Sequence, residues 1–125
     1  MIEAGAIVRI PFPFSNLGAN KKRPVLVLCP PDALGDFLGM AVTSKGHHGK
    51  ALAIGDADLT SGRLPLASWV RPSKVFTLDA QVVSDRVATV APAFLQRALR
   101  ELCDVVGGPV ALAGEPPADR AIQDR

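Results

Sequence analysis

The chain has 125 residues, enough for one domain with a hydrophobic core and too few for two comfortable ones. Apolar residues make up 48% of it and charged residues 21%, which is a globular composition and excludes disorder of the whole chain. The net charge of +2 says little about partners, but the first quarter has one acid, Glu3, and a local surplus of cations. These cations are Arg9, Lys21, Lys22 and Arg23.

The amino-terminal residues lack the charged-then-apolar pattern of a signal peptide, and no apolar run approaches the length of a membrane span. A cytoplasmic location is therefore expected. The two cysteines, Cys29 and Cys103, lie in apolar patterns and are expected to be reduced core thiols. No metal site is expected, because neither these cysteines nor the adjacent His47 and His48 have the spacing of a ligand set.

The first predicted strand covers residues 6–10, which are rich in β-branched side chains. It ends at two prolines, which cannot donate to a strand ladder. Phe12 and Phe14 lie two apart and point the same way in an extended segment, so each either covers one end of the core or offers a stacking face to an RNA base. The polar segment 15–20, which ends at Asn20, predicts a loop that can close over a ligand.

Three cations and a proline, Lys21-Lys22-Arg23-Pro24, precede an apolar run over residues 25–28. The run predicts a strand buried on both faces, and proline is tolerated at the first residue of such a strand. The Arg23 guanidinium is then held at the rim of a rigid sheet, which is a good place to hold a phosphate. A solvated basic loop before a buried strand is the alternative interpretation.

A third strand is predicted over residues 37–43, and it ends at two hydroxyl groups, those of Thr43 and Ser44. The basic segment 45–50 contains His47 and His48 and is expected to be a flexible loop that touches phosphate. The elements expected beyond it are a short strand over 51–54, a turn-rich excursion over 55–65, a strand over 68–75 with an interruption at Pro72, and a last strand within 82–90.

The period of the apolar residues then changes from two to three or four, which predicts an amphipathic helix laid on the sheet. Pro92 suits its first turn and Gly107-Gly108 its end. The apolar stripe consists of Phe94, Leu95, Ala98, Leu99, Leu102, Val105 and Val106. Residues 108–125 show no periodicity and are expected to form a flexible C-terminal tail, which leaves residues 1–107 as the folded domain.

Five blocks of this sequence resemble the MazF/PemK toxin family, in the order in which that family has them. The blocks are residues 5–8, 11–14, 22–28, 41–44 and 70–79. The resemblance implies a mostly β fold, a small SH3-like antiparallel barrel with a C-terminal α-helix. It also implies a cytoplasmic homodimer that acts as the toxin of a type II toxin–antitoxin system. Such a toxin cleaves single-stranded RNA, including mRNA, at specific sequences without a metal or cofactor. Its partners are a cognate antitoxin and, only through that antitoxin, operator DNA.

In that family the Arg of the Arg-Pro block and the Thr that closes the next long strand form the active site, which implies catalytic roles for Arg23 and Thr43. Ser44 and Arg71 are further catalytic candidates, although Ser73 stands where relatives commonly carry Asp. The residues expected to bind RNA are Phe14, Asn20, Lys21, Lys22, His47, His48 and Lys74.

The expected chemistry is attack of the RNA 2′-hydroxyl on the adjacent phosphorus. Arg23 can donate two parallel hydrogen bonds to phosphate oxygens, and Thr43 can orient the hydroxyl or share a proton. Two alternatives remain open. The chain could be a toxin that binds a protein target, as the gyrase poison CcdB does, or a catalytically weakened relative that binds RNA or DNA.

Overall fold

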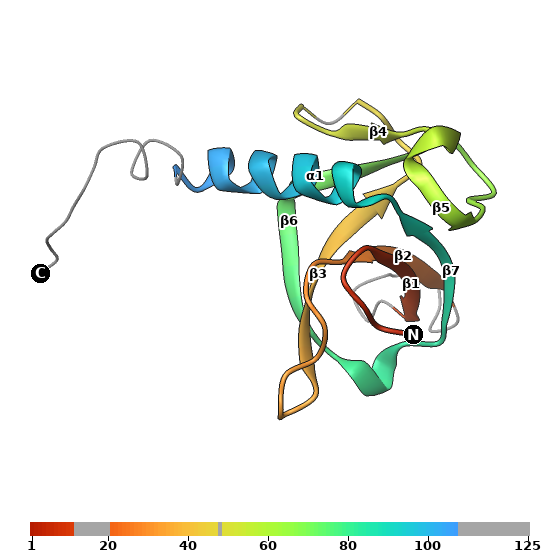
Figure 1. Cartoon of the computed structure of the whole chain (residues 1–125), viewed down its shortest axis with the longest axis vertical. Coiled ribbons are helices and arrows are strands. Elements are labelled where there is room, and N and C mark those ends of the chain that lie inside the picture. Colours follow the sequence, from red (N-terminus) through yellow and green to blue (C-terminus); the bar gives the residue numbers. More distant parts are fainter. Residues whose placement is uncertain (12–20, 48, 108–125) are drawn as a thin grey trace, which may run out of the picture.

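The computed structural model describes residues 1–11, 21–47 and 49–107, and these form one antiparallel sheet curled into a nearly closed barrel with a helix on it (Figure 1). The strands are β1 (Ala6–Pro11), β2 (Lys22–Val27), β3 (Asp36–Thr43), β4 (Leu52–Ile54), β5 (Leu59–Gly62), β6 (Ser68–Asp79) and β7 (Asp85–Val90). The helix is α1 (Pro92–Val105), and two 3₁₀ turns are η1 (Asp56–Asp58) and η2 (Ala80–Val82). The mostly β fold with a terminal helix is therefore confirmed.

The strands follow the order β4-β6-β3-β2-β1-β7-β5 across the sheet, so β2 is the central strand. The run from Val25 to Leu28 is buried throughout, as predicted. Alternate residues of β1 and β2 serve two separate core clusters, because successive side chains of a strand point to opposite faces. Ile7 and Leu26 belong to one cluster, and Val8 and Val25 to the other.

Helix α1 covers the cluster that contains Ile7 and Leu26. It begins at Pro92, in the first-turn position where the missing N–H has no intrahelical partner. Phe94 and Ala98 are buried, and three leucines of the predicted stripe are partly buried against the same cluster. The end of the stripe was assigned wrongly: Val105 is 41% and Val106 71% exposed, because the helix runs past the sheet there (Figure 1).

Two elements differ from the sequence-based expectations. Residues 55–65 were expected to be only a turn-rich excursion, but they contain η1 and strand β5, which pairs with β7 at the edge of the sheet. Strand β6 was expected over residues 68–75, but it continues to Asp79 and pairs with β3 and β4. Pro72 is fully buried in it.

The interruption at Pro72 takes the form of a bulge. Met40 pairs with Val75 and Val42 with Val70, so the four residues 71–74 of β6 face a single residue of β3. Proline is tolerated there because a bulged residue owes no ladder hydrogen bond. The bulge consists of the Arg-Pro-Ser-Lys segment that carries part of the family resemblance.

The remaining expectations concern the thiols and membrane spans. Cys29 and Cys103 are free, as predicted, but both are half-buried rather than core residues, because each lies at the border of a cluster. Among the described residues, no helix is long and apolar enough to cross a membrane.

Candidate functional site

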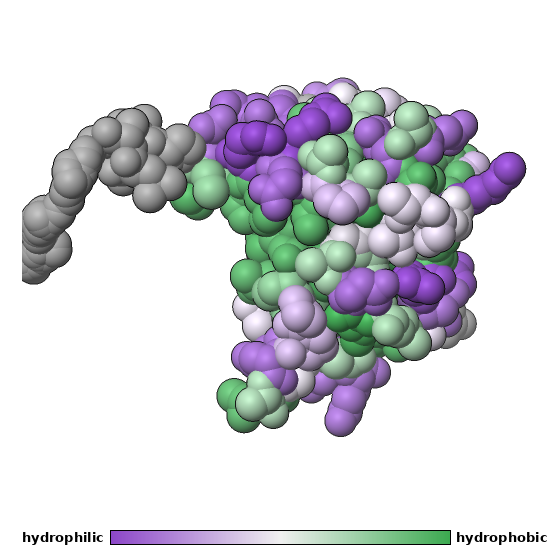
Figure 2. Space-filling view, viewed as in Figure 1, coloured by the Kyte–Doolittle hydropathy of each residue, from purple (hydrophilic) through white to green (hydrophobic). Residues whose placement is uncertain are grey.

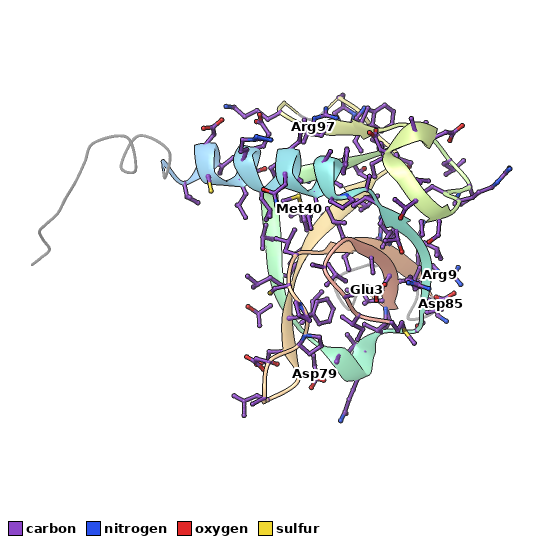
Figure 3. All side chains as sticks on the ribbon, viewed as in Figure 1. Glu3, Arg9, Met40, Asp79, Asp85 and Arg97 are labelled. Carbon is purple, nitrogen blue, oxygen red and sulfur yellow. The ribbon has the colours of Figure 1, made fainter. Side chains whose placement is uncertain are left out.

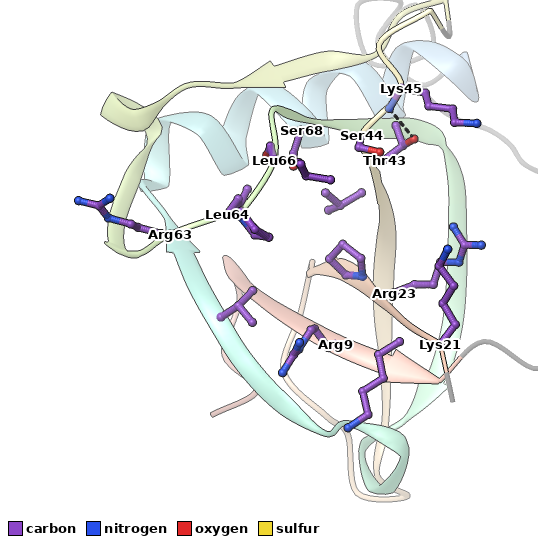
Figure 4. Close-up of a pocket in the computed structure, with 15 residues that line it drawn as sticks. Arg9, Lys21, Arg23, Thr43, Ser44, Lys45, Arg63, Leu64, Leu66 and Ser68 are labelled. Carbon is purple, nitrogen blue, oxygen red and sulfur yellow. Dashed lines mark hydrogen bonds between the residues drawn. The ribbon is translucent and has the colours of Figure 1, made fainter. Parts of the chain in front are cut away.

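A pocket of about 520 Å³ lies beside the start of β2 and the end of β3 (Figure 4). The segment 63–67, which links β5 to β6, forms its other wall together with Ser68 at the start of β6. The pocket is lined by Arg9, Lys21, Lys22, Arg23, Pro24, Val42, Thr43, Ser44, Lys45, Arg63, Leu64, Pro65, Leu66, Ser68 and Val87. It therefore brings together the two predicted catalytic residues and two of the predicted RNA-binding lysines.

The pairing of β2 with β3 brings Arg23 and Thr43 to one end of the strand pair. The register runs from Val27 opposite Gly39 to Val25 opposite Ala41, so Arg23 and Thr43 each lie two residues beyond its last rung. Residues two apart in a strand point to the same face, so Arg23 shares a face with Val25, and Thr43 with Ala41. Both residues line the pocket, although they are 20 residues apart in sequence.

The Arg23 side chain is half-buried, and its Nε is shielded from solvent without a hydrogen-bond partner among the described residues. The Nε of Arg71, in the β6 bulge, is in the same state. A buried donor without an acceptor typically destabilises a fold by about 1–3 kcal/mol, so native proteins rarely keep one without a reason. Both guanidinium groups therefore retain unused donors for an anionic ligand.

The Thr43 hydroxyl is oriented by the turn that follows β3. Its Oγ1 accepts a hydrogen bond from the Lys45 backbone N–H at 3.1 Å, so the hydroxyl hydrogen is left to donate to another group (Figure 4). Gly46 completes this turn against Trp69, because a Cβ at Gly46 would lie 2.5 Å from the indole ring. Trp69 is also the strand partner of Thr43.

Charge distinguishes the pocket from the rest of the surface. Six cationic side chains line it, and within the described residues no carboxylate does. In Figure 4 the labelled cations stand on different sides of the cavity, Arg63 across from Arg23. Part of the lining is apolar and includes Pro24, Val42 and Val87. An apolar surface beside cations can hold a base next to its phosphates.

The other predicted site residues are distributed unevenly. Ser44, Lys21 and Lys22 line the pocket, whereas Arg71, Lys74 and His47 are not among its lining residues. Phe14, Asn20 and His48 lie outside the described residues, as does the tail over 108–125. A second pocket of about 370 Å³ follows β5 and shares Arg63 and Leu64 with the first.

Three pocket cations, Arg9, Lys45 and Arg63, were not predicted as site residues. A signal for Arg9 was present, because an arginine between Val8 and Ile10 must point away from the cluster that those residues share. Lys45 was indicated only through its segment, since residues 45–50 were expected to form a loop that touches phosphate. Arg63 had no such signal, because it lies in a loop whose course the sequence does not determine.

Metal ligation has no support in the described side chains. Within residues 1–11, 21–47 and 49–107, no three His, Cys, Asp or Glu side chains are grouped so that they could hold an ion. The polar groups of the pocket are hydroxyls and cations, a donor set that suits an anion.

Comparisons with solved structures show the same fold. The chain is similar to an endoribonuclease from Mycobacterial species in complex with its cognate antitoxin, with 20% identity and a TM-score of 0.62 over 84% of this chain and 92% of that one. It is also similar to a MazE–MazF complex from Deinococcus radiodurans, with 21% identity and a TM-score of 0.66 over 84% of this chain and 94% of that one.

Sequence comparison gives the family. No curated protein matches the chain. A family model described as PemK-like, MazF-like toxin of type II toxin-antitoxin system matches residues 3–106, which is most of the chain. The protein therefore belongs to the PemK-like, MazF-like family of toxins of type II toxin–antitoxin systems.

Proposed function

We propose that this protein is an endoribonuclease that cleaves single-stranded RNA, including mRNA, and serves as the toxin of its toxin–antitoxin pair. The observation that carries the proposal is that Arg23 and Thr43 line one pocket whose charged lining residues, among those described, are all cations. Family membership supports the toxin role, and the names of similar structures support RNA cleavage.

The reaction is a transesterification within the RNA. The 2′-oxygen forms a bond to the adjacent phosphorus, and the bond from phosphorus to the 5′-oxygen breaks. A base takes the 2′-hydroxyl proton, and the departing 5′-oxygen takes up a proton. The products carry a 2′,3′-cyclic phosphate and a 5′-hydroxyl. Negative charge develops on the non-bridging oxygens of the phosphorane, and this charge is what the site must stabilise.

Arg23 is assigned to that charge. Its guanidinium can donate two parallel hydrogen bonds to the non-bridging oxygens, and its Nε lacks any other acceptor among the described residues. It is a poor general base, because a guanidinium stays protonated in water. The Thr43 hydroxyl orients the attacking 2′-hydroxyl or passes on its proton, since its own oxygen already accepts from Lys45. Ser44 and Arg71 are further candidates for proton transfer and charge stabilisation.

The remaining cations bind the RNA backbone. Lys21 and Lys22 line the pocket next to Arg23, and Lys74 lies on the bulge of β6. Phe14, Asn20, His47 and His48 keep their assignment to RNA binding. Cleavage is proposed to be sequence-specific, with the loops around the pocket reading the bases, and to need no metal because the Arg23 guanidinium supplies the positive charge.

Two protein partners are proposed. One is a cognate antitoxin, as in the mycobacterial and Deinococcus complexes, through which alone operator DNA would be bound. The other is a second copy of this chain. Figure 2 shows apolar side chains gathered along β6 below α1. Exposed apolar residues on the neighbouring elements include Leu38, on the β3 strand that pairs with β6, and Val105, at the end of α1. Light scattering at micromolar concentration should give the mass of a dimer, and a monomer would contradict the second copy.

The deciding experiment incubates the purified protein with a long single-stranded RNA in EDTA. Discrete cuts are expected, with 5′-hydroxyl ends that polynucleotide kinase labels directly. A single 2′-deoxy substitution at a mapped cut site should abolish cleavage there. Cleavage that requires added magnesium would refute the mechanism. A protein that inhibits growth without cutting RNA would instead be a binder of a protein target, and one that only binds RNA would be a weakened relative.

A further inference from the structure

Arg9 is held in place by Asp85 at the edge of the pocket. Its Nε donates to Asp85 Oδ1 at 2.9 Å, and its Nη2 donates to Asp85 Oδ2 at 2.6 Å. The two residues are direct partners in the pairing of β1 with β7, and Figure 3 shows them side by side at β7. Two parallel hydrogen bonds of this kind fix the plane of a guanidinium as well as its position.

Arg9 lines the pocket, whereas its ion-pair partner Asp85 does not. Arg9 pairs with Pro24, and the neighbouring rung of the same ladder pairs Ile10 with Arg23. Consecutive residues of a strand point to opposite faces, so the two guanidinium groups approach the pocket from different sides, as Figure 4 shows.

The ion pair leaves Arg9 able to bind an anion. A guanidinium has five N–H donors, and Asp85 accepts two of them. The Arg9 side chain is 45% exposed, so the remaining donors are accessible. Within the described part of the chain, Arg9 is the one pocket cation that pairs with a carboxylate. It is therefore fixed before a ligand arrives, unlike the pocket lysines, whose flexible stems must be ordered on binding.

A cross-strand ion pair on a surface typically contributes little to stability, so stability alone does not explain this one. The same sheet offers a comparison. Arg86 donates to Glu3 at 2.7 Å and is similarly exposed at 42%, but neither residue lines the pocket.

We infer that Arg9 binds an RNA phosphate other than the scissile one and so sets the position of the strand relative to Arg23. Asp85 is a positioning residue that acts through Arg9. This inference rests on the proposed function, because its ligand is RNA, and it adds that Arg9 positions the RNA backbone.

The test measures binding rather than cleavage, so that the two proposals can fail separately. The probe is a fully 2′-O-methylated single-stranded RNA, which cannot undergo 2′-hydroxyl attack. Arg9→Ala should weaken its binding about tenfold and reduce the salt dependence by about one phosphate contact. Arg86→Ala, the matched control, should change neither. Arg9→Lys should fall between wild type and Arg9→Ala, because it keeps the charge and loses the planar fork.

A scan with a single neutral methylphosphonate at each position of the probe locates the contact. One position should weaken wild-type binding while having no further effect on Arg9→Ala, because the contact is already lost. Asp85→Ala should show a smaller loss at the same position, and Asp85→Glu should restore part of it. Two results would overturn the inference. One is that a methylphosphonate at every position weakens the binding of Arg9→Ala as much as it weakens that of wild type. The other is that Arg9→Ala and Arg86→Ala bind the probe equally well. If the wild-type protein does not cleave RNA, this result refutes the proposed function but not the role of Arg9 in binding.

Discussion

Replacing Arg23 tests the proposed mechanism most directly. Arg23→Ala removes the guanidinium that lines the pocket together with Thr43, and its Nε has no structural partner among the described residues to lose. Loss of a transition-state donor typically lowers the rate about 100- to 1,000-fold, or roughly 3–4 kcal/mol. Arg23→Lys should recover part of this loss, because an ammonium keeps the charge but cannot donate in parallel.

The assay is single-turnover cleavage of a short RNA with one mapped site, measured with binding of the same sequence in 2′-O-methyl form. Binding by Arg23→Ala should weaken less than cleavage, since Lys21, Lys22 and Lys45 still line the pocket. A thermal midpoint close to that of wild type shows that the fold is retained. Cleavage that survives in Arg23→Ala, or that falls only in proportion to binding, would refute the assignment.

Four further predictions follow from the same structure. Gly46→Ala should shift the fluorescence of Trp69, the only tryptophan, and slow cleavage, because the new Cβ would collide with the indole. Gly49→Ala is the silent control, since no atom of the described residues lies within 4 Å of its added Cβ. Phe94→Ala should destabilise the fold by about 3–5 kcal/mol in denaturant titrations, whereas exposed Gln96→Ala should stay within about 0.5 kcal/mol. Deletion of residues 108–125, proposed to be a dispensable tail, should leave the thermal midpoint nearly unchanged, and a large drop would mean that the tail docks. Hydrogen bonding to Arg9 lowers the pKa of Asp85 below its ordinary value of 3.8. The contribution of this ion pair to stability is therefore complete above that pH and is lost only as the pH falls through the lowered value. The ratio of the RNA affinities of wild type and Arg9→Ala should accordingly be constant from about pH 5 to 8.

The central strands were predictable from the sequence because their patterns are strong and local. An apolar run buried on both faces identified β2, and a change of period identified α1. Strand β5 was missed because it is four residues long and mostly exposed, and its pairing with β7 leaves no local pattern in the sequence. The last four residues of β6 were missed for a related reason, since the strand continues beyond Val75 by pairing with β3, whereas the predicted interruption at Pro72 is present as a bulge.

The site was predictable to the extent that single strands define it. Arg23 and Thr43 came from a resemblance, and the pairing of β2 with β3 then brings them to one end of the strand pair. The sequence indicated which way Arg9 points but not its role, because that role depends on Asp85, a residue 76 positions away that the β1–β7 pairing brings close. Long-range pairing of this kind determines which exposed charges converge on one pocket and which remain scattered.

The same pairing leaves the pocket in an unfavourable electrostatic state. Six cations face one cavity, and the buried Nε atoms of Arg23 and Arg71 lack acceptors among the described residues. Like charges that converge repel one another, and unpaired buried donors destabilise the fold. Among the described residues, Asp85 compensates part of this charge by pairing with Arg9, and it restrains the guanidinium without occupying all of its donors. A polyanion in the pocket screens the repulsion, so it should bind the native state in preference to the unfolded chain and stabilise it by mass action. The features that weaken the free protein are therefore the ones that favour an RNA backbone in this pocket.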